Sequence, residues 1–210
     1  MPSETVSFET LLDRDPLCLY AGDVPEAREY GKFVGLSLWH HDARHIKHDI
    51  TVPMPLPDGC VDVYQAEDVF EHIDIASLPG VVSEIHRVLK PGGVFRLAVP
   101  DYRCDVLAGR SVRDGNGRIV FDPGGGGRFE DGKVVGGGHL WFPTYESVND
   151  LLRNSPFRDI RFLHYYDEAA RSVLREIDYS IGHVSRTPDN DDRVKSPRRP
   201  MSIVVDLVKD

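Results

Sequence analysis

Four side chains able to take part in chemistry stand close together in the stretch AEDVFEHID, namely Glu67, Asp68, Glu71 and His72. If the chain enters a helix here, Asp68, Glu71 and His72 lie at positions i, i+3 and i+4, on one face. Two carboxylates and an imidazole on one face suit a hard or borderline divalent cation. The alternative interpretation is a solvated helix surface, or a Glu-His pair that only orders a loop.

Three further groups are candidates for acid–base work. His139 lies in GGGHLWF, and Asp101 and Asp105 lie in VPDYRCD, just after a predicted strand. A histidine with a pKa near neutrality can take the proton of an attacking hydroxyl group, and a bound cation can acidify that hydroxyl instead. Asp101 is an alternative base or acceptor-binding group, or it only caps the strand.

Short apolar runs that end in turns predict the elements that position these residues. We expect strands at residues 16–20, 31–38, 45–50 and 59–67. In IASLPGVVSEIHRVLKPGG the apolar residues recur at intervals of three and four, which predicts one helix with a buried stripe. That stripe consists of Leu78, Val81, Val82, Ile85, Val88 and Leu89. KPGG ends the helix, because proline and glycine do not continue it, and VFRLAVP follows as a strand.

A strand–helix–turn–strand order with short links predicts a mainly parallel sheet. Beyond residue 100 the chain becomes rich in glycine and aspartate. TYESVNDLLRNSPF then predicts a helix with Thr144 as N-cap, and RDIRFLHYYD and MSIVVDLVKD predict two closing strands. We therefore expect residues 1–210 to form a single α/β domain, in which residues 102–140 and 167–200 are insertions on the acceptor side.

Composition limits the class of protein. The chain is 40% hydrophobic and 28% charged, with a formal net charge of −9, and it shows no basic face of the kind that supplies most of the affinity for a duplex. No apolar run approaches the roughly 20 residues that span a bilayer, and the first residues lack a signal-peptide layout. The three cysteines stand far apart, in no metal-like spacing. We expect a cytoplasmic protein that binds neither nucleic acid nor membrane.

Four stretches in this order resemble class I S-adenosylmethionine-dependent methyltransferases. They are LYAGD, LPDGCVDVYQAEDVFEHI, EIHRVLKPGGVFRLAVPD and GHLWFPTYESVNDLL. The resemblance covers roughly residues 16–165. It implies a Rossmann-like, doubly wound, mostly parallel sheet with an antiparallel closing strand, and S-adenosylmethionine as cofactor.

The same resemblance assigns cofactor-binding residues at the carboxyl ends of the strands, where ligands of such sheets lie. It places the methionine part over a tight turn, the adenine beside the third strand and the sulfonium above the fourth. The residues so implied are Tyr20, Ala21 and Gly22 for the turn, Asp49 and Ile50 for the adenine, and Ala66 and Glu67 for the sulfonium. Gly22 and Asp49 have the alternative roles of a turn residue and a loop cap.

Two departures from the family pattern weaken the expected cofactor site. Only Gly22 remains of the usual glycine-rich turn, and FVGLSL puts Leu36 and Ser37 where a carboxylate normally holds the ribose. Ser37 would make one hydrogen bond in place of two, so we expect binding weaker by about 1–2 kcal/mol. A non-catalytic methyltransferase-like binding or assembly module is the alternative. A nicotinamide oxidoreductase is disfavoured, because no G-x-G-x-x-G follows the first strand.

The spacing D-x-x-E-H resembles the E-x-x-E-H of metal-dependent O-methyltransferases, in which a downstream histidine completes the site. This resemblance implies a magnesium or manganese site formed by Asp68, Glu71, His72 and His139, with His139 and His72 as catalytic candidates. A metal-free role of His139 as general base is the competing hypothesis. Aromatic and short polar residues in the insertions favour a sugar, glycan or small polyhydroxy acceptor and methylation on oxygen. The oligomeric state is left open.

Overall fold

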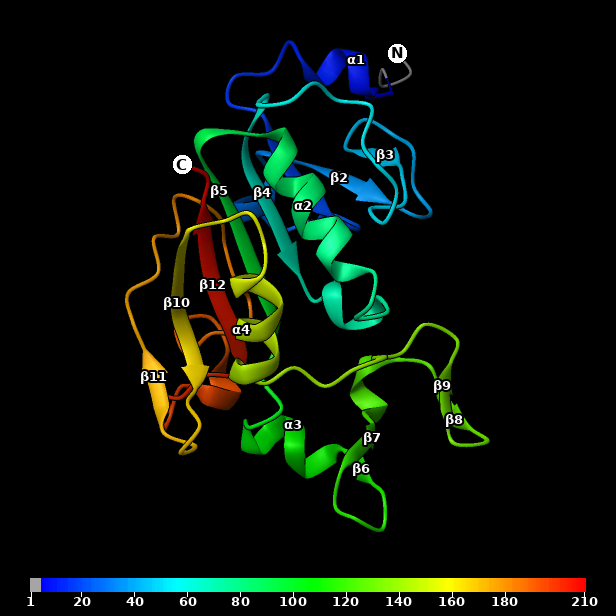
Figure 1. The fold of residues 1–210 in the computed structure, drawn as a ribbon, viewed down its shortest axis with the longest axis vertical. Coiled ribbons are helices and arrows are strands. Elements are labelled where there is room, and N and C mark those ends of the chain that lie inside the picture. The colour runs from blue at the N-terminus through cyan, green and yellow to red at the C-terminus, as the bar shows by residue number, and fades with distance from the viewer. Residues whose placement is uncertain (1–4) are drawn as a thin grey trace.

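A computed structural model describes residues 5–210, and its centre is an eight-stranded sheet (Figure 1). The strands of this sheet are β1 (Cys18–Ala21), β2 (Phe33–Ser37), β3 (His45–Lys47), β4 (Val61–Glu67), β5 (Leu89–Pro100), β10 (Asp159–Tyr166), β11 (Ser172–Leu174) and β12 (Ser202–Val208). The helices are α1 (Phe8–Leu11), α2 (Leu78–Val88), α3 (Asp105–Arg110) and α4 (Tyr145–Arg153), and 3-10 turns cover Arg28–Tyr30, Phe70–His72, Pro123–Gly125 and Asp192–Val194.

The strand order is β11-β10-β12-β5-β4-β1-β2-β3. Strands β3, β2, β1, β4 and β5 run parallel, and β12 is antiparallel to both of its neighbours, β5 and β10. The predicted α/β fold with a mostly parallel, Rossmann-like sheet and an antiparallel closing strand is confirmed. The sequence did not reveal that this antiparallel strand lies inside the sheet, nor that β11 extends the edge beyond β10.

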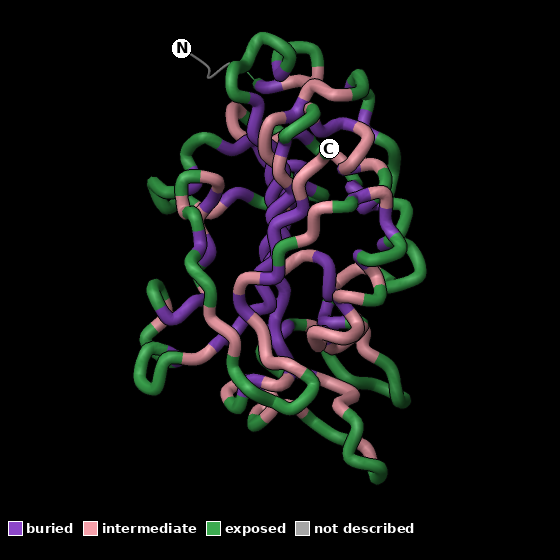
Figure 2. The backbone as a smooth tube through the Cα atoms, turned by 60° about the vertical axis from the view of Figure 1, so that its left-hand side comes forward, coloured by how far each residue is buried: buried purple, intermediate pink, exposed green. Residues whose placement is uncertain are grey.

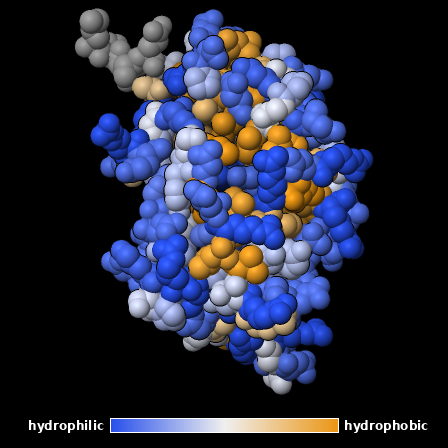
Figure 3. Space-filling model, turned by 90° about the vertical axis from the view of Figure 1, so that its left-hand side faces the viewer, coloured by the Kyte–Doolittle hydropathy of each residue, from blue (hydrophilic) through white to orange (hydrophobic). Residues whose placement is uncertain are grey.

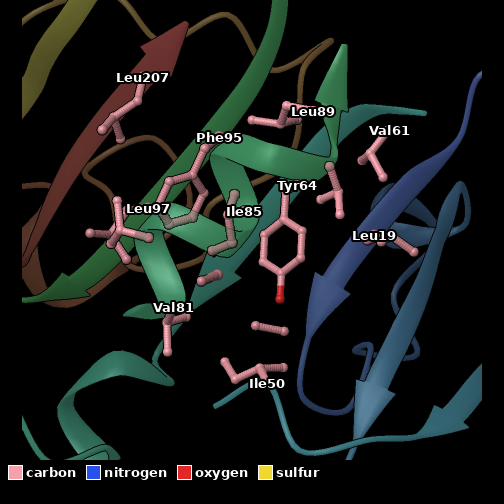
Figure 4. Close-up of a cluster of buried hydrophobic side chains, with 14 of the residues drawn as sticks. Leu19, Ile50, Val61, Tyr64, Val81, Ile85, Leu89, Phe95, Leu97 and Leu207 are labelled. Carbon is pink, nitrogen blue, oxygen red and sulfur yellow. The ribbon is translucent and has the colours of Figure 1, made fainter. Parts of the chain in front are cut away.

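One face of the sheet is covered by α2 and α4 (Figure 1). The predicted stripe of α2 is buried, and its side chains pack with those of β4 and β5, among which Tyr64, Ile85 and Phe95 lie close together (Figure 4). Helix α4 begins with the expected cap at Thr144, whose N–H bonds the Ser147 hydroxyl at 3.0 Å. Burial of one apolar stripe on each helix therefore positions both helices.

The other face is covered by residues 175–200, which carry no long helix. The buried guanidinium of Arg96 on β5 donates to the Asp178 and Gly182 carbonyls at 2.8 and 2.5 Å, and Gln65 on β4 donates to the His183 carbonyl. The links β1–β2 and β2–β3 span only residues 22–32 and 38–44, short of the dozen residues usual for a helical crossover. Polar side chains on the sheet therefore hold an irregular segment where helices would otherwise pack.

The predicted excursion of residues 102–140 contains α3 and two small hairpins, β6 (Val112–Arg113) with β7 (Ile119–Phe121) and β8 (Arg128–Glu130) with β9 (Lys133–Val135). The hairpins project beyond the carboxyl ends of the parallel strands (Figure 1). Along the backbone, buried residues run through the centre of the molecule and exposed ones dominate the loops (Figure 2). Whether the excursion receives an acceptor stays a prediction.

The expected helix after β4 is wrong. β4 continues to Glu67, Asp68 adopts a left-handed backbone with φ of 56°, and a single 3-10 turn covers Phe70–His72. A left-handed residue cannot continue into a right-handed helix. The carboxylate of Asp68 consequently does not share a helix face with Glu71 and His72.

Among residues 5–210, no helix has both the length and the apolar character needed to cross a bilayer. The face that carries the β11 edge is mostly hydrophilic, with hydrophobic side chains gathered near its middle (Figure 3). The expected cytoplasmic location stays a prediction.

Candidate active site at the carboxyl ends of the strands

A small cavity of about 140 Å³ lies at the carboxyl ends of β1, β2, β3 and β4. Its lining includes three residues expected to bind cofactor, Gly22, Asp49 and Ile50. The remaining lining residues are Leu36, Leu38, His48, Val69, His72 and Ile73. A crevice at this edge is where doubly wound sheets bind their ligands.

Two glycines let the backbone close around this cavity. Gly22 has φ of 85°, a conformation that other residues rarely adopt. Gly35 lies on β2, and a Cβ added there would stand 2.6 Å from the Gly22 carbonyl oxygen. Gly35 was not anticipated, although a glycine inside a strand is itself a signal of close backbone approach.

The other expected cofactor residues lie outside the cavity lining. Tyr20, Ala21 and Ala66 are buried within the sheet. The Ser37 hydroxyl oxygen accepts hydrogen bonds from two backbone N–H groups of the following turn, at 3.0 and 2.9 Å. Glu67 extends toward the opposite face of the sheet. There it accepts from the Tyr30 hydroxyl and the Ser185 N–H, both at 2.7 Å. These contacts give Ser37 and Glu67 structural partners.

No carboxylate of the cavity lining stands at the end of β2, where Leu36 and Leu38 lie instead. Asp49, at the end of β3, already accepts bonds from the Thr51 N–H and hydroxyl at 2.9 and 2.7 Å. The cavity is therefore lined by Leu36 and Leu38 at this strand end, and the predicted weaker binding of the ribose stays a prediction.

Beside the cavity, Glu71, His72 and His139 bring one ligand atom each within 4.8 Å of one another. His72 belongs to both features, since it also lines the cavity. The two imidazole rings meet edge to face with centroids 4.6 Å apart. His139 Nε2 stands 3.6 Å from Glu71 Oε1. Three of the four residues predicted to bind metal thus come together.

Hydrogen bonds to backbone carbonyls hold the segment around His139 against the turn that carries Glu71 and His72. The Leu140 N–H donates to the Glu71 carbonyl at 2.7 Å, and the Trp141 indole N–H donates to the Phe70 carbonyl at 2.9 Å. His72 Nδ1 lies 2.7 Å from the Gly137 carbonyl, which can only accept, so Nδ1 carries the proton. The segment that follows the hairpins is therefore fixed onto the turn that follows β4.

Burial controls the charges of the cluster. Glu71 is fully buried, and neither carboxylate oxygen has a hydrogen-bond partner among residues 5–210. Burial, together with repulsion from Asp68, holds the pKa of Glu71 well above its usual range. Burial and the neighbouring His72 lower the pKa of His139 to about 4. His139 is therefore neutral at physiological pH, with one ring nitrogen free to accept a proton.

Asp68, predicted with Glu71, His72 and His139 as a metal ligand, is not part of the cluster that these three residues form, and its role as a ligand stays a prediction. Its carboxylate forms an ion pair of 2.5 Å with Arg186. Burial raises the pKa of Asp68 to about 6, against the attraction of Arg186. The left-handed backbone at Asp68 turns the side chain toward residues 175–200, so sequence spacing alone was misleading here.

Asp101 is fully buried at the end of β5. One carboxylate oxygen accepts from the Arg103 N–H at 3.0 Å and the other from the Tyr166 N–H at 2.8 Å, while burial raises the pKa of the group to about 6. These bonds favour the capping role over the role of alternative base. Asp105 forms an exposed ion pair with Arg199.

Sequence reasoning missed the partners of His139. The buried side chains of Tyr102 and Asp122 and the half-buried side chain of Arg110 form a hydrogen-bonded series behind its ring. Close packing beside His139 explains why glycines occur in PGGGG and GGGH. A Cβ at Gly125 would lie 2.6 Å from the His139 ring, and one at Gly127 would lie 2.6 Å from the Gly138 nitrogen. The available signal was the two glycine runs that precede the candidate histidine in the sequence.

Comparison with known proteins agrees with this geometry. A family model described as a methyltransferase domain matches residues 20–97. A protein of Mycolicibacterium smegmatis, named "Probable S-adenosylmethionine-dependent methyltransferase/", is 39% identical over 80 residues, which are 38% of this chain and 24% of the relative. The chain thus spans about a quarter of that relative's length.

Two solved structures share the fold. The S-adenosylmethionine-dependent methyltransferase of Archaeoglobus fulgidus superposes with a TM-score of 0.53 at 16% identity, covering 91% of this chain and 85% of the other. The one from Mesorhizobium loti gives 0.52 at 17% identity, covering 91% and 90%. Residues 20–97 thus resemble a methyltransferase domain, and the chain as a whole shares the fold of class I S-adenosylmethionine-dependent methyltransferases. In this protein Gly22, Asp49 and Ile50 line the strand-end cavity, and the cluster of Glu71, His72 and His139 adjoins it.

Proposed function

We propose that the protein is an S-adenosylmethionine-dependent methyltransferase acting on an oxygen of a sugar, glycan or small polyhydroxy acceptor. The observation that carries the proposal is the position of His72, which lines the strand-end cavity and also belongs to the buried cluster with Glu71 and His139. A methyl donor in the cavity and a proton acceptor in the cluster would thus be neighbours.

The chemistry asks little of the protein beyond placement and proton removal. The acceptor oxygen attacks the sulfonium methyl group, the O–C bond forms as the S–C bond breaks, and S-adenosylhomocysteine leaves. The site must hold the two reactants close and aligned. His139 Nε2, neutral because burial lowers the pKa of the ring, takes the hydroxyl proton as the oxygen attacks.

The cluster also fits a divalent cation. Glu71 offers two buried oxygens without a partner, and the two imidazoles complete a set of one carboxylate and two nitrogens. Such a mixed set suits manganese better than magnesium, which prefers oxygen ligands. Glu71, His72 and His139 would hold the ion, which would supply a Lewis acid that acidifies a bound hydroxyl.

A non-catalytic binding or assembly module is the second candidate. The observation that favours it is the size of the cavity, about 140 Å³, against roughly 300–1,000 Å³ for typical small-molecule sites. Binding of a cofactor of ordinary size would require this cavity to widen. The negative net charge of −9 supports a small or glycan acceptor in preference to nucleic acid.

Calorimetric titration with S-adenosylhomocysteine, with and without manganese, tests the proposal. We expect saturable one-site binding that Gly22→Ala weakens at least about tenfold, since a Cβ at this left-handed position strains the turn. Gly117→Ala is the matched control, because Gly117 is also left-handed, with φ of 79°, but has open space around it. Absence of binding to the unmodified protein would favour the non-catalytic module.

A further inference from the structure

A hydrogen-bonded series of four side chains, of which Arg110 is half-buried and the other three are buried, runs through the insertion and ends at the cluster. Arg110 Nη2 donates to Asp122 Oδ2 at 2.7 Å, and the Tyr102 hydroxyl donates to the same oxygen at 2.7 Å. The Tyr102 oxygen lies 2.5 Å from His139 Nδ1. Tyr102, Asp122 and His139 are each at most 5% exposed, so water does not compete for the bonds among these three side chains.

The donors and acceptors available on these four side chains determine which atom donates in each hydrogen bond. Asp122 is paired with Arg110 and accepts from the Gly124 N–H at 2.8 Å, so it acts as an ionised acceptor. A tyrosine hydroxyl has a single proton, and Tyr102 uses it in the hydrogen bond that it donates to Asp122. The Tyr102 oxygen is then left to accept, and the proton between it and His139 must belong to Nδ1.

The other nitrogen of the ring is thereby assigned. A neutral imidazole with its proton on Nδ1 carries its lone pair on Nε2, the atom that lies 3.6 Å from Glu71. The ring cannot easily turn over, because its face packs on Gly125, where even a Cβ would stand 2.6 Å away. The insertion thus supplies both the histidine and the groups that orient it.

We propose that Tyr102, Asp122 and Arg110 are positioning residues that fix His139 as the Nδ1–H tautomer, with the Nε2 lone pair presented to Glu71 and His72. The consequence for catalysis rests on the proposed function, since both a general base and a metal ligand need that lone pair. The tautomer itself is a property of the protein without cofactor or acceptor.

Long-range ¹H–¹⁵N correlation spectra of the histidine rings test the proposal directly. In the unmodified protein we expect His139 to show a protonated Nδ1 and an unprotonated Nε2. Tyr102→Phe removes only the hydroxyl and should convert His139 to a mixture of tautomers or to Nε2–H. Tyr179→Phe is the matched control. The Tyr179 hydroxyl also donates to an aspartate, Asp189, at 2.9 Å, but neither residue belongs to the hydrogen-bonded series that ends at His139.

Calorimetry with manganese ions alone gives a second readout. Where the unmodified protein binds manganese, Tyr102→Phe should lower the affinity about 10–100-fold, the usual effect of losing the partner of a ligand histidine, and Tyr179→Phe should leave it unchanged. A His139 with its proton on Nε2 in the unmodified protein overturns the inference, even if Tyr102→Phe does not fold. Failure to bind S-adenosylhomocysteine would refute the proposed function and leave the tautomer result standing.

Discussion

At the scale of single residues, the buried carboxylates of this protein differ chiefly in their partners. Asp122 accepts hydrogen bonds from the Arg110 guanidinium and the Tyr102 hydroxyl. Asp206 accepts two hydrogen bonds from the Arg96 guanidinium, one on each carboxylate oxygen. Asp101 accepts from two backbone N–H groups. Glu71 has none. Burying a charge without a partner is costly, so an unpaired carboxylate beside two histidines marks the place where a ligand or a shared proton belongs.

Asp101 provides a test of the capping role through pH. Its pKa in the folded protein is about 6 instead of 3.8, so between these values the folded state binds the proton more tightly than the unfolded state. Stability from this group therefore falls as pH rises from about 4 to about 6, by at most about 3 kcal/mol.

We expect Asp101→Asn to remove that pH dependence while leaving the affinity for S-adenosylhomocysteine unchanged. At neutral pH the variant should still be less stable than the unmodified protein, by about 1–3 kcal/mol, because one backbone N–H loses its acceptor. Urea unfolding at both ends of the pH range measures the difference. An unchanged pH profile would mean that Asp101 does not titrate as the structure indicates.

At the scale of elements, strand ends and the turns after them create the site. The turns after β1, β3 and β4 supply the cavity, and the approach of β2 to the first turn depends on Gly35. The segment after the hairpins is bonded to the turn after β4. Small shifts of these elements should therefore affect ligand binding more than stability.

Gly35→Ala tests this dependence. A Cβ would stand 2.6 Å from the Gly22 oxygen and from the His45 ring, so the first turn must shift, at a cost of about 1–3 kcal/mol. We expect the affinity for S-adenosylhomocysteine to fall at least about tenfold. Gly80→Ala on α2 has open space and should stabilise the protein by about 0.5–1 kcal/mol with unchanged binding. Equal binding by both variants would contradict the role given to Gly35.

At the scale of the whole molecule, helices cover one face of the sheet and residues 175–200 cover the other. The buried ion pair of Arg96 with Asp206 anchors this segment, because the same guanidinium bonds two of its carbonyls. Arg186 at the end of the anchored stretch then reaches Asp68 beside the cluster. The contacts of Arg96 and Arg186 therefore link the sheet, residues 175–200 and the turn after β4.

Arg96→Met should lower the free energy of unfolding by about 3–5 kcal/mol, because it leaves Asp206 buried without its partner. Limited proteolysis followed by mass spectrometry should show new cleavage within residues 175–200. Arg171→Met is the control: Arg171 pairs with Asp167 on the surface, its side chain is 79% exposed, and such pairs contribute at most about 1 kcal/mol. Cleavage spread evenly along the Arg96 variant would argue against a separate anchoring role.

The sequence by itself determined the features that depend on local pattern. The apolar spacing of α2 and the N-cap of α4 follow from neighbours along the chain, and the strand–helix–turn–strand order predicted the parallel sheet. Because parallel strands deliver their carboxyl ends to one edge, the sequence also predicted that Gly22, Asp49 and Ile50 would meet.

Only the tertiary structure decided the partners of the polar groups. Glu71 and His139 are close because the insertion folds back onto the turn after β4, while Asp68 turns to Arg186 and Asp101 to two backbone amides. Hydrogen bonds and ion pairs between segments far apart leave no periodic trace in sequence, since each depends on how the whole backbone brings two side chains together. The physical reason is that backbone preference and the apolar pattern depend on residues close in sequence, whereas the pairing of buried charges depends on residues far apart in sequence.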